Sequence, residues 1–213
     1  MPRIKEKEKI IHRPSTQEIF RCLSYMPGWS KVLLNNIEEK PYHVFLKWLI
    51  DRNFYKALEE RITIKQIATD FKGEAIQITK WLHEIHKNIL DLNFDRPELF
   101  KAEGIKVRLY MRHYDNYGNQ FVYLPAIPRK FETFSFPFIH ASMGTDSFWA
   151  KKVEHQLEDN NTEITIWLDG GSLNTYREFL LEKAQFHDQI GFMEIFTQHS
   201  FEIDKKLKQL YRN

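Results

Sequence analysis

The stretch from Arg61 to Lys87, RITIKQIATDFKGEAIQITKWLHEIHK, has the pattern of two short helices joined by a tight turn. Its first half carries apolar residues at the spacing of one helix face: Ile64, Ile67, Ala68 and Phe71. Thr63 is suited to cap the start of this helix. We expect Gly73 to end it, because glycine adopts the left-handed backbone conformation that closes a helix without steric cost.

A second amphipathic helix is predicted from Glu74 onward. Its apolar positions are expected to face inward: Ala75, Ile78, Trp81, Leu82 and Ile85. Its polar positions are expected to face outward: Gln77, Thr79, Lys80, His83, Glu84 and Lys87. The outer face of this helix therefore mixes basic, acidic and neutral polar side chains.

This helix pair resembles the helix-turn-helix of DNA-binding domains. In that superfamily a small residue in the first helix, a glycine in the turn and a branched residue in the second helix allow close packing, and Ala68, Gly73 and Ile78 match these roles. The spacing from Ala68 to Gly73 is one residue longer than in the commonest pattern, as winged-helix members allow. The resemblance is confined to residues 61–87, and any two short amphipathic helices joined by a glycine share much of it.

The composition is that of a folded protein, since 42% of the 213 residues are hydrophobic and 15% are aromatic. The single cysteine, Cys22, excludes an intramolecular disulfide framework and a multi-cysteine zinc site. We expect a cytoplasmic protein that does not enter a membrane, because neither a signal-peptide pattern nor a long apolar run is present. The net charge of +2 is nearly balanced, but residues 1–101 carry 18 basic and 14 acidic side chains, against 13 and 15 in residues 102–213.

Further helices are predicted before this pair. Ser15 and Glu18 indicate a capped helix that ends at Pro27-Gly28, followed by a short helical or irregular piece to Asn35-Asn36. A longer helix is expected after Pro41, in PYHVFLKWLIDRNFYKAL. In a winged-helix domain this would be the first helix, packed behind the helix-turn-helix.

Beyond Gly104 the sequence changes to the two-residue period of strands. Residues 105–124 are predicted to form a hairpin around the turn DNYGN, either as the wing of the helix-turn-helix or as part of a following sheet. Residues 130–140 are interpreted as another strand, and residues 147–168 as a second hairpin. Ser172 is expected to cap a helix to about Gln185, and a last helical segment to span 191–211.

The predicted fold class is therefore α+β. A flexible charged arm, residues 1–14, precedes a helical, winged helix-turn-helix-like domain, residues 15–101. A mainly antiparallel β-sheet with C-terminal helices follows in residues 102–213, where the period changes from helix to strand.

Motifs for catalysis or cofactor binding are weak. His83 and His86 lie three residues apart, whereas the zinc-protease motif requires four, and no third ligand is identifiable, so we expect neither metal nor cofactor. The turn Asp169-Gly170-Gly171-Ser172 could hold an anion but is more simply the exit from a strand. The phenylalanines of residues 131–138 could stack single-stranded bases, although a core role is favoured. No enzymatic activity is expected.

The leading hypothesis is sequence-specific binding to double-stranded DNA by a transcriptional or mobile-element regulator. The predicted contacts are Lys65, Lys72, Gln77, Thr79, Lys80 and His83 on the helices, with Arg108 and Arg112 on the hairpin as wing contacts. The C-terminal domain is assigned to a possible homodimer. The alternative is a protein-interaction or assembly module that uses the same fold without DNA, and a nuclease would further require a carboxylate cluster that the sequence does not reveal.

Overall fold

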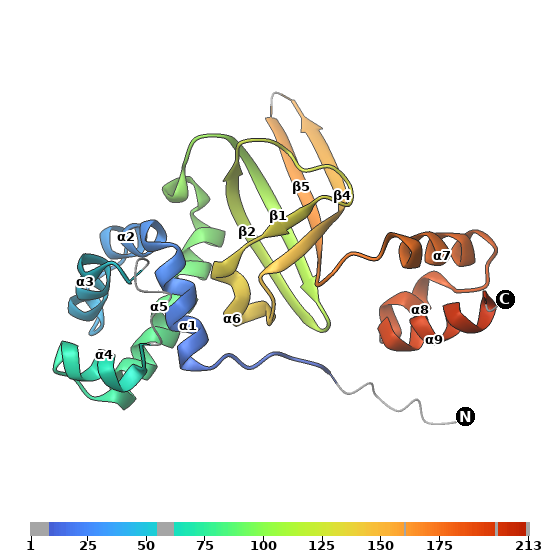
Figure 1. The fold of residues 1–213 in the computed structure, drawn as a ribbon. Helices are drawn as coiled ribbons and strands as arrows, with labels where there is room; N and C mark the ends of the chain where they lie inside the picture. Colours follow the sequence, from blue (N-terminus) through green and yellow to red (C-terminus); the bar gives the residue numbers. More distant parts are fainter. Residues whose placement is uncertain (1–8, 55–61, 160, 199, 212–213) are drawn as a thin grey trace, which may run out of the picture.

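A computed structural model describes residues 9–54, 62–159, 161–198 and 200–211. Three parts lie in a row, with N-terminal helices at one end, a curled β-sheet in the middle and C-terminal helices at the other end (Figure 1). The predicted α+β class is confirmed. None of the described helices is long and apolar enough to cross a membrane.

The N-terminal part is built from α1 (Thr16–Tyr25), α2 (Pro27–Asn36), α3 (His43–Arg52), α4 (Ile64–Phe71) and α5 (Ala75–Asp95), with the short 3-10 helix η2 (Pro97–Phe100) after them. The capped start of α1 is confirmed, because the Ser15 hydroxyl accepts from the Glu18 amide and the Glu18 carboxylate accepts from the Ser15 amide. α2 starts at Pro27 itself, which suits the first turn of a helix. α3 ends at Arg52 with Asn53 as its C-cap, and part of the longer helix predicted there lies outside the described residues.

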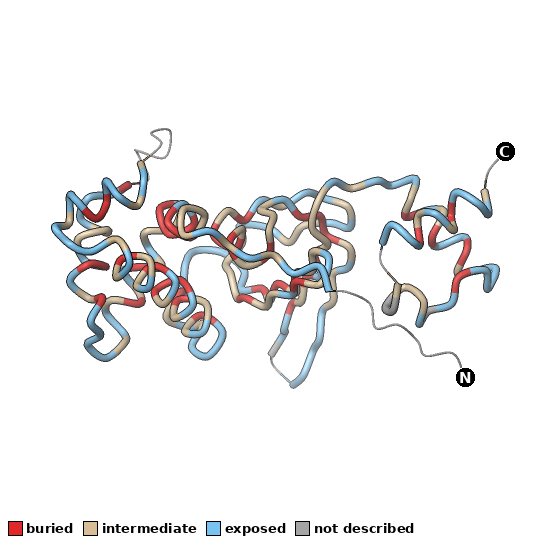
Figure 2. Tube along the Cα trace, turned by 90° about the horizontal axis from the view of Figure 1, so that it is seen from below, coloured by how far each residue is buried: buried red, intermediate tan, exposed pale blue. Residues whose placement is uncertain are grey.

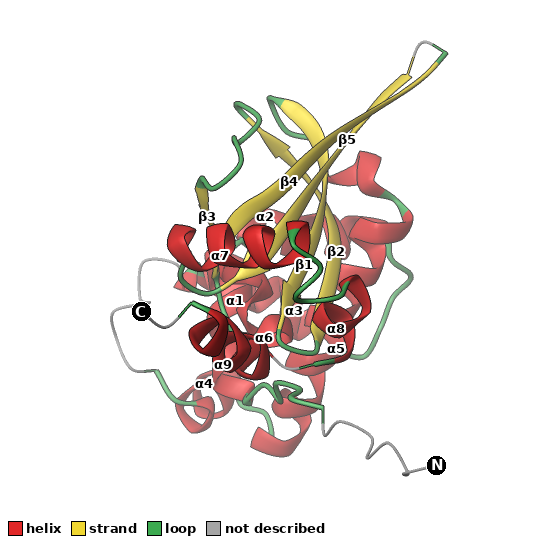
Figure 3. Ribbon diagram, turned by 90° about the vertical axis from the view of Figure 1, so that its right-hand side faces the viewer, coloured by secondary structure: helices red, strands yellow, loops and turns green. Residues whose placement is uncertain are grey.

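The sheet has the strand order β2-β1-β5-β4-β3. Its strands are β1 (Ile105–His113), β2 (Asn116–Leu124), β3 (Thr133–Ser135), β4 (Ser147–Glu158) and β5 (Asn161–Gly170). Both predicted hairpins are confirmed, and the β4–β5 ribbon extends beyond the other strands (Figure 3). β1 also pairs in parallel with β5, so the first hairpin is an integral part of this sheet.

The strand predicted over residues 130–140 is mostly wrong. Only β3 pairs with β4, and the chain then forms the 3-10 helix η3 (Pro137–Ile139) and the short helix α6 (His140–Met143). Pro137 explains the change, because proline donates no ladder hydrogen bond and fixes a backbone angle suited to the start of a helical turn.

One hydrophobic cluster runs from the N-terminal helices into the sheet (Figure 2). On β1, Val107, Leu109 and Met111 are buried in it, so strand alternation places Arg108 and Arg112 on the opposite, outer face. α5 is tied to the sheet by Asn93, whose side chain donates to the Phe121 carbonyl at 2.9 Å and accepts from the Phe121 amide at 2.8 Å. The helices therefore cover one face of the sheet and leave the other uncovered by them.

The C-terminal part contains α7 (Thr175–Phe186), α8 (Phe192–Thr197) and α9 (Ser200–Leu210) around a small core of its own. It follows β5 after a short connection (Figure 1). The predicted cap at Ser172 is wrong, because Asn174 caps α7 by accepting from the Arg177 amide at 2.9 Å. The turn after β5, with Gly171 at φ +92°, takes up the intervening residues.

Candidate nucleic-acid interface

The turn between α4 and α5 closes differently from the sequence prediction. Lys72, rather than Gly73, adopts the left-handed conformation (φ 59°, ψ 41°), and the Gly73 amide donates to the Ala68 carbonyl at 2.9 Å. A Cβ on Gly73 would lie 3.0 Å from Cδ1 of the Phe71 ring and 3.6 Å from Cδ1 of Ile78. Glycine is therefore favoured here because it leaves room for the two helices to approach.

The start of α4 is confirmed as a capping box. The Thr63 hydroxyl accepts from the Gln66 amide at 3.3 Å, and the Gln66 side-chain oxygen accepts from the Thr63 amide at 2.7 Å. This arrangement satisfies two backbone groups that would otherwise lack partners at the helix start. Both ends of the first helix of the pair are thus fixed by local hydrogen bonds.

A rigid base supports the helix pair. Ile67, Ile78 and Leu82 are fully buried between α4, α5 and the remaining helices. Beside them the Phe45 ring contacts the rings of Phe71 and Trp81, with centroids 5.0 and 5.6 Å apart. The outer face of the pair is therefore held in one orientation by the core behind it.

The outward stripe of α5 consists of Ile76, Lys80, His83 and Lys87, which are exposed and follow one another at helical spacing. Gln77 and Thr79 are half-buried at its margins. Lys65 on α4 and Lys72 in the turn are exposed as well. The structure therefore places all six predicted helix contacts on this helix pair, with four of them exposed, and adds Ile76 to the same face.

The lysines of this face have no ion-pair partner within the described residues. Among the residues that the structure describes, Lys65, Lys72, Lys80 and Lys87 form no ion pair, whereas Asp70 is neutralised by Arg52 at 2.7 Å. Four acidic residues also belong to α5 and its N-cap: the exposed Glu74, Asp91 and Asp95 and the half-buried Glu84. The helix pair thus carries available positive charge, moderated by these carboxylates.

Arg108 and Arg112 lie elsewhere. Both are on the outer face of the sheet, opposite the face that packs against the helices. Arg108 donates from Nε to Asn119 Oδ1 at 3.1 Å, and its Nη1 lies 3.4 Å from Glu163 Oε1. Its guanidinium also lies over the rings of Tyr110 and Phe121. The structure thus places these arginines on the sheet face opposite the helices, and the hairpin that carries them belongs to the sheet.

The outer face of the sheet holds an aromatic and ionic ladder that the sequence did not reveal. Tyr110 and Trp167 stack at 4.6 Å with an angle of 11° between their rings. Lys151 pairs with Asp169 at 2.8 Å, Lys152 pairs with Glu154, and Glu154 also accepts from the Trp167 indole. Only the parallel pairing of β1 with β5 makes Tyr110 and Trp167 neighbours. Alternation along each strand predicts the face on which a side chain lies, but it does not predict that Tyr110 and Trp167 are neighbours.

The two histidines of α5 lie in different environments. His83 is exposed with Nε2 3.5 Å from the Thr16 hydroxyl, whereas His86 is buried with Nε2 3.1 Å from the Phe138 carbonyl. Burial lowers the pKa of His86, against the opposing effect of that hydrogen bond. Within the described parts of the chain, no three histidine, cysteine or acidic side chains are placed to hold a metal ion.

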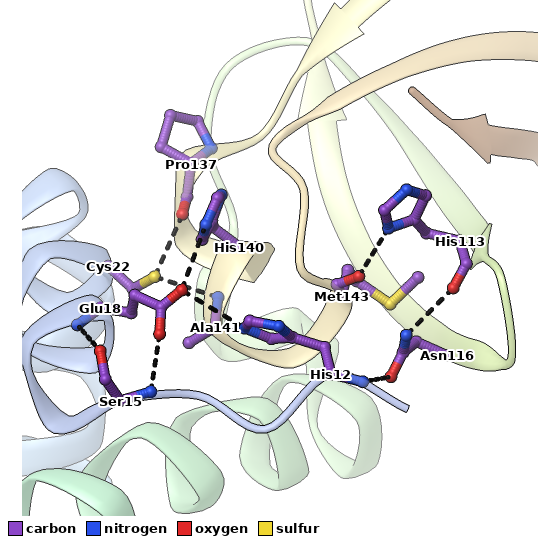
Figure 4. A network of polar contacts seen from close by, with 10 residues as sticks. All are labelled: His12, Ser15, Glu18, Cys22, His113, Asn116, Pro137, His140, Ala141 and Met143. Carbon is purple, nitrogen blue, oxygen red and sulfur yellow. Dashed lines mark hydrogen bonds and ion pairs between the residues drawn. The ribbon is translucent and has the colours of Figure 1, made fainter. Parts of the chain in front are cut away.

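A second polar cluster connects the segment before α1 to α1, α6 and β2 (Figure 4). Glu18 Oε1 lies 3.4 Å from His12 Nε2 and 3.5 Å from Nε2 of His140 in α6. The His12 amide donates to Asn116 Oδ1 at 3.0 Å, which links the segment to the start of β2. Of the arm predicted over residues 1–14, the described part therefore contacts both the helices and the sheet, and residues 1–8 lie outside the described residues.

The candidate anion turn lines a cleft of about 420 Å³ between the end of the sheet and α7–α9. The Gly171 amide already donates to the Ser147 carbonyl at 2.9 Å. The nearby cations Lys151 and Arg177 are paired with Asp169 and Asp204. The Gly171 amide and both nearby cations therefore already have partners within the protein.

The phenylalanines of residues 131–138 divide between core and surface. Phe136 and Phe138 are buried, and both rings contact Trp29 of α2, with centroids 5.8 and 5.1 Å from it. Phe131 and Phe134 are half-buried. The core interpretation is thus confirmed for the two inner rings, and the four do not form a continuous stacking face.

No protein-family model, curated protein or solved structure matches this chain.

Proposed function

We propose that this protein binds double-stranded DNA in a sequence-specific manner, as a transcriptional or mobile-element regulator, and that α5 enters the major groove. The observation that carries the proposal is the set of unpaired lysines on an exposed, rigidly backed helix-turn-helix. An α-helix fits the width of the major groove, and lysines without acidic partners are free to replace the counterions of DNA phosphates.

The two helices have different roles in this proposal. Lys80, Thr79 and His83 on α5 reach base edges, with Gln77 at the margin of the same surface. Lys65 on α4 and Lys72 in the turn contact phosphates and fix the orientation of the protein on the duplex. Glu74 and Glu84 weaken non-specific attraction, so we expect base contacts to contribute a substantial part of the affinity.

Arg108 and Arg112 are not included in the proposed interface. They lie on the sheet face opposite the helices, where Arg108 donates a hydrogen bond to Asn119 and pairs with Glu163. A duplex docked on α5 would have to curve around the sheet to reach them. The proposal therefore rests on the helix pair alone.

The test is the affinity of the full chain for mixed-sequence duplex DNA, measured by fluorescence anisotropy over a range of salt concentrations. At low salt we expect a Kd of about 1–100 μM or tighter, and the logarithm of the affinity should fall with the logarithm of salt by roughly 0.9 for each phosphate contacted. A triple variant, Lys65→Gln, Lys72→Gln and Lys80→Gln, should lose most of this binding. Absence of binding at low salt would refute the proposal.

A matched control uses three lysines of the sheet region. Lys106→Gln, Lys151→Gln and Lys152→Gln remove the same formal charge from β1 and β4. If the lysines of the helix pair bind DNA, the control triple should retain nearly all of the affinity. Equal losses in the two triples would instead indicate attraction by net charge, without a defined interface.

A second candidate function, self-association or partner binding through the C-terminal helices, is favoured by α7. Tyr176, Phe179 and Phe186 are all exposed on this single helix. Clustered exposed aromatics are typical of interaction surfaces. Sedimentation of the full chain and of a Tyr176→Ser, Phe186→Ser variant would test a homodimer: dimerisation that is lost in the variant supports it, and a monomeric wild-type protein excludes it.

A further inference from the structure

Ile76 is the most exposed large hydrophobic residue among those that the structure describes, at 85%. It lies in the first turn of α5, at the end of that helix next to the turn after α4. The same helix buries Ile78, Ile85 and Ile89 completely. An isoleucine on the polar side of an amphipathic helix exposes apolar surface to water, and covering that surface with another molecule lowers the free energy.

The surroundings of Ile76 are polar. Lys80 follows it by one helical turn and His83 by two, while Lys72 and Glu74 lie just before it in the chain. A protein interface would require a broader apolar surface around this residue. Within the described residues, Lys72 and Lys80 have no ion-pair partner, and a single apolar side chain between two such lysines suits an anionic surface that offers one small apolar group.

We propose that Ile76 contacts the C5-methyl group of a thymine in the major groove, which makes it a specificity-determining residue. The inference rests on the proposed DNA binding and names one base that the interface reads. In the major groove thymine alone presents a methyl group, whereas the other base edges present hydrogen-bond donors and acceptors that isoleucine cannot satisfy. Covering those polar groups with an aliphatic side chain would leave them unpaired, which disfavours the other bases.

The side chain is suited to this task. A β-branched residue in a helix has essentially one preferred χ1 rotamer, so Ile76 presents its methyl groups in a fixed direction. It also lies near the N-terminal end of α5, and the N-terminal residues of a recognition helix are those that contact base edges.

The experiment combines a change in the protein with a change in the DNA. Duplexes that the full chain selects from a random library are resynthesised with deoxyuridine at each thymine in turn, which removes only the methyl group. Wild-type protein should lose about fourfold in affinity at one position, corresponding to ~0.8 kcal/mol for one buried methyl-sized group. Ile76→Ala should bind the thymine and deoxyuridine duplexes equally, and alanine preserves the helix.

Val44→Ala is the matched control, since Val44 is a similarly exposed aliphatic residue on α3. This variant should show the wild-type preference for thymine. A preference that persists unchanged in Ile76→Ala, or a wild-type protein indifferent to every methyl group, would overturn the inference while DNA binding itself stands. If no duplex is selected and no salt-dependent binding occurs, the proposed function fails first and the inference with it.

Discussion

The outer face of the α4–α5 helix pair and the outer face of the sheet both carry basic side chains, but these side chains have different partners on the two faces. On the sheet, Arg108 and Lys151 each pair with a carboxylate of β5, and Lys152 pairs with Glu154 of its own strand. On the helix pair, within the described residues, Lys65, Lys72 and Lys80 have no such partner. Composition alone does not distinguish these surfaces.

The difference separates a surface whose cations already have partners within the protein from one whose lysines, within the described residues, have none. Cations of the sheet lie beside carboxylates and over aromatic rings, so a ligand would have to displace contacts already made. Exposed pairs of this kind contribute little to stability, but they neutralise local charge. The lysines of the helix pair can accept phosphates without first losing a partner. Available charge, rather than total charge, therefore identifies the candidate interface.

The largest expected effect concerns the core that both faces share. Leu82 is fully buried under the helix pair, and the hydrophobic cluster continues from it into the sheet. Leu82→Ala should lower the free energy of unfolding by about 2–5 kcal/mol, because it leaves a cavity. In urea titrations, helix content by far-UV circular dichroism and aromatic signals of the sheet should change in one transition. Separate transitions would show that the two faces belong to independently folding units.

A smaller effect is expected from one lysine of the helix pair. Lys80→Ala should weaken DNA binding by roughly fivefold, about 1 kcal/mol, and reduce the salt slope by about 1, with little change in stability, since the residue is exposed. The matched variant Lys152→Ala removes a paired lysine of the sheet and should leave DNA affinity unchanged. Unchanged affinity in Lys80→Ala would remove α5 from the interface.

A pH-dependent prediction concerns Glu18, which joins the helices to the segment before α1 and to α6. Burial alone would raise the pKa of Glu18, but hydrogen bonds from the backbone and hydroxyl of Ser15, together with His12 and His140, lower it below the ordinary value of 4.5. The ionised carboxylate therefore stabilises the fold at neutral pH. This stabilisation is lost as pH falls below the ordinary value and through the lowered one.

Glu18→Gln should accordingly be less stable than wild type at pH 7, and the two proteins should converge in stability toward pH 3. Thermal unfolding across this pH range measures the difference. His12→Ala, which leaves the Ser15 capping box in place, should reproduce only part of the loss. A difference that is constant with pH would show that the effect of the substitution does not depend on the charge of Glu18.

Much of this architecture follows from local sequence patterns. Alternation in residues 105–124 and 147–168 predicts both hairpins, and the capping residues Ser15 and Thr63 mark two helix starts correctly. Local signals fail where two residues compete for one role. Asn174 rather than Ser172 caps α7, and Lys72 rather than Gly73 takes the left-handed position.

The remaining features depend on contacts between distant segments. Tyr110 and Trp167 stack because β1 and β5 pair in parallel, and no hairpin pattern indicates that pairing. The helical period predicts which lysines face outward, but only the three-dimensional arrangement distinguishes lysines with an ion-pair partner from those without one among the described residues. The sequence does not distinguish Ile76 from the apolar residues of the core, because its exposure follows only from how α5 packs in three dimensions.

The smallest expected effect tests the sheet side of the comparison. Arg108→Ala removes a hydrogen bond to Asn119, an ion pair with Glu163 and contacts over the rings of Tyr110 and Phe121. Because exposed pairs and cation–π contacts contribute little each, stability should fall by about 1 kcal/mol or less. DNA affinity should not change, since the guanidinium already contacts Asn119 and Glu163 and lies on the sheet face opposite α5. A loss of affinity comparable to that of Lys80→Ala, without a matching loss of stability, would place the sheet in the DNA interface and remove the distinction between the two faces.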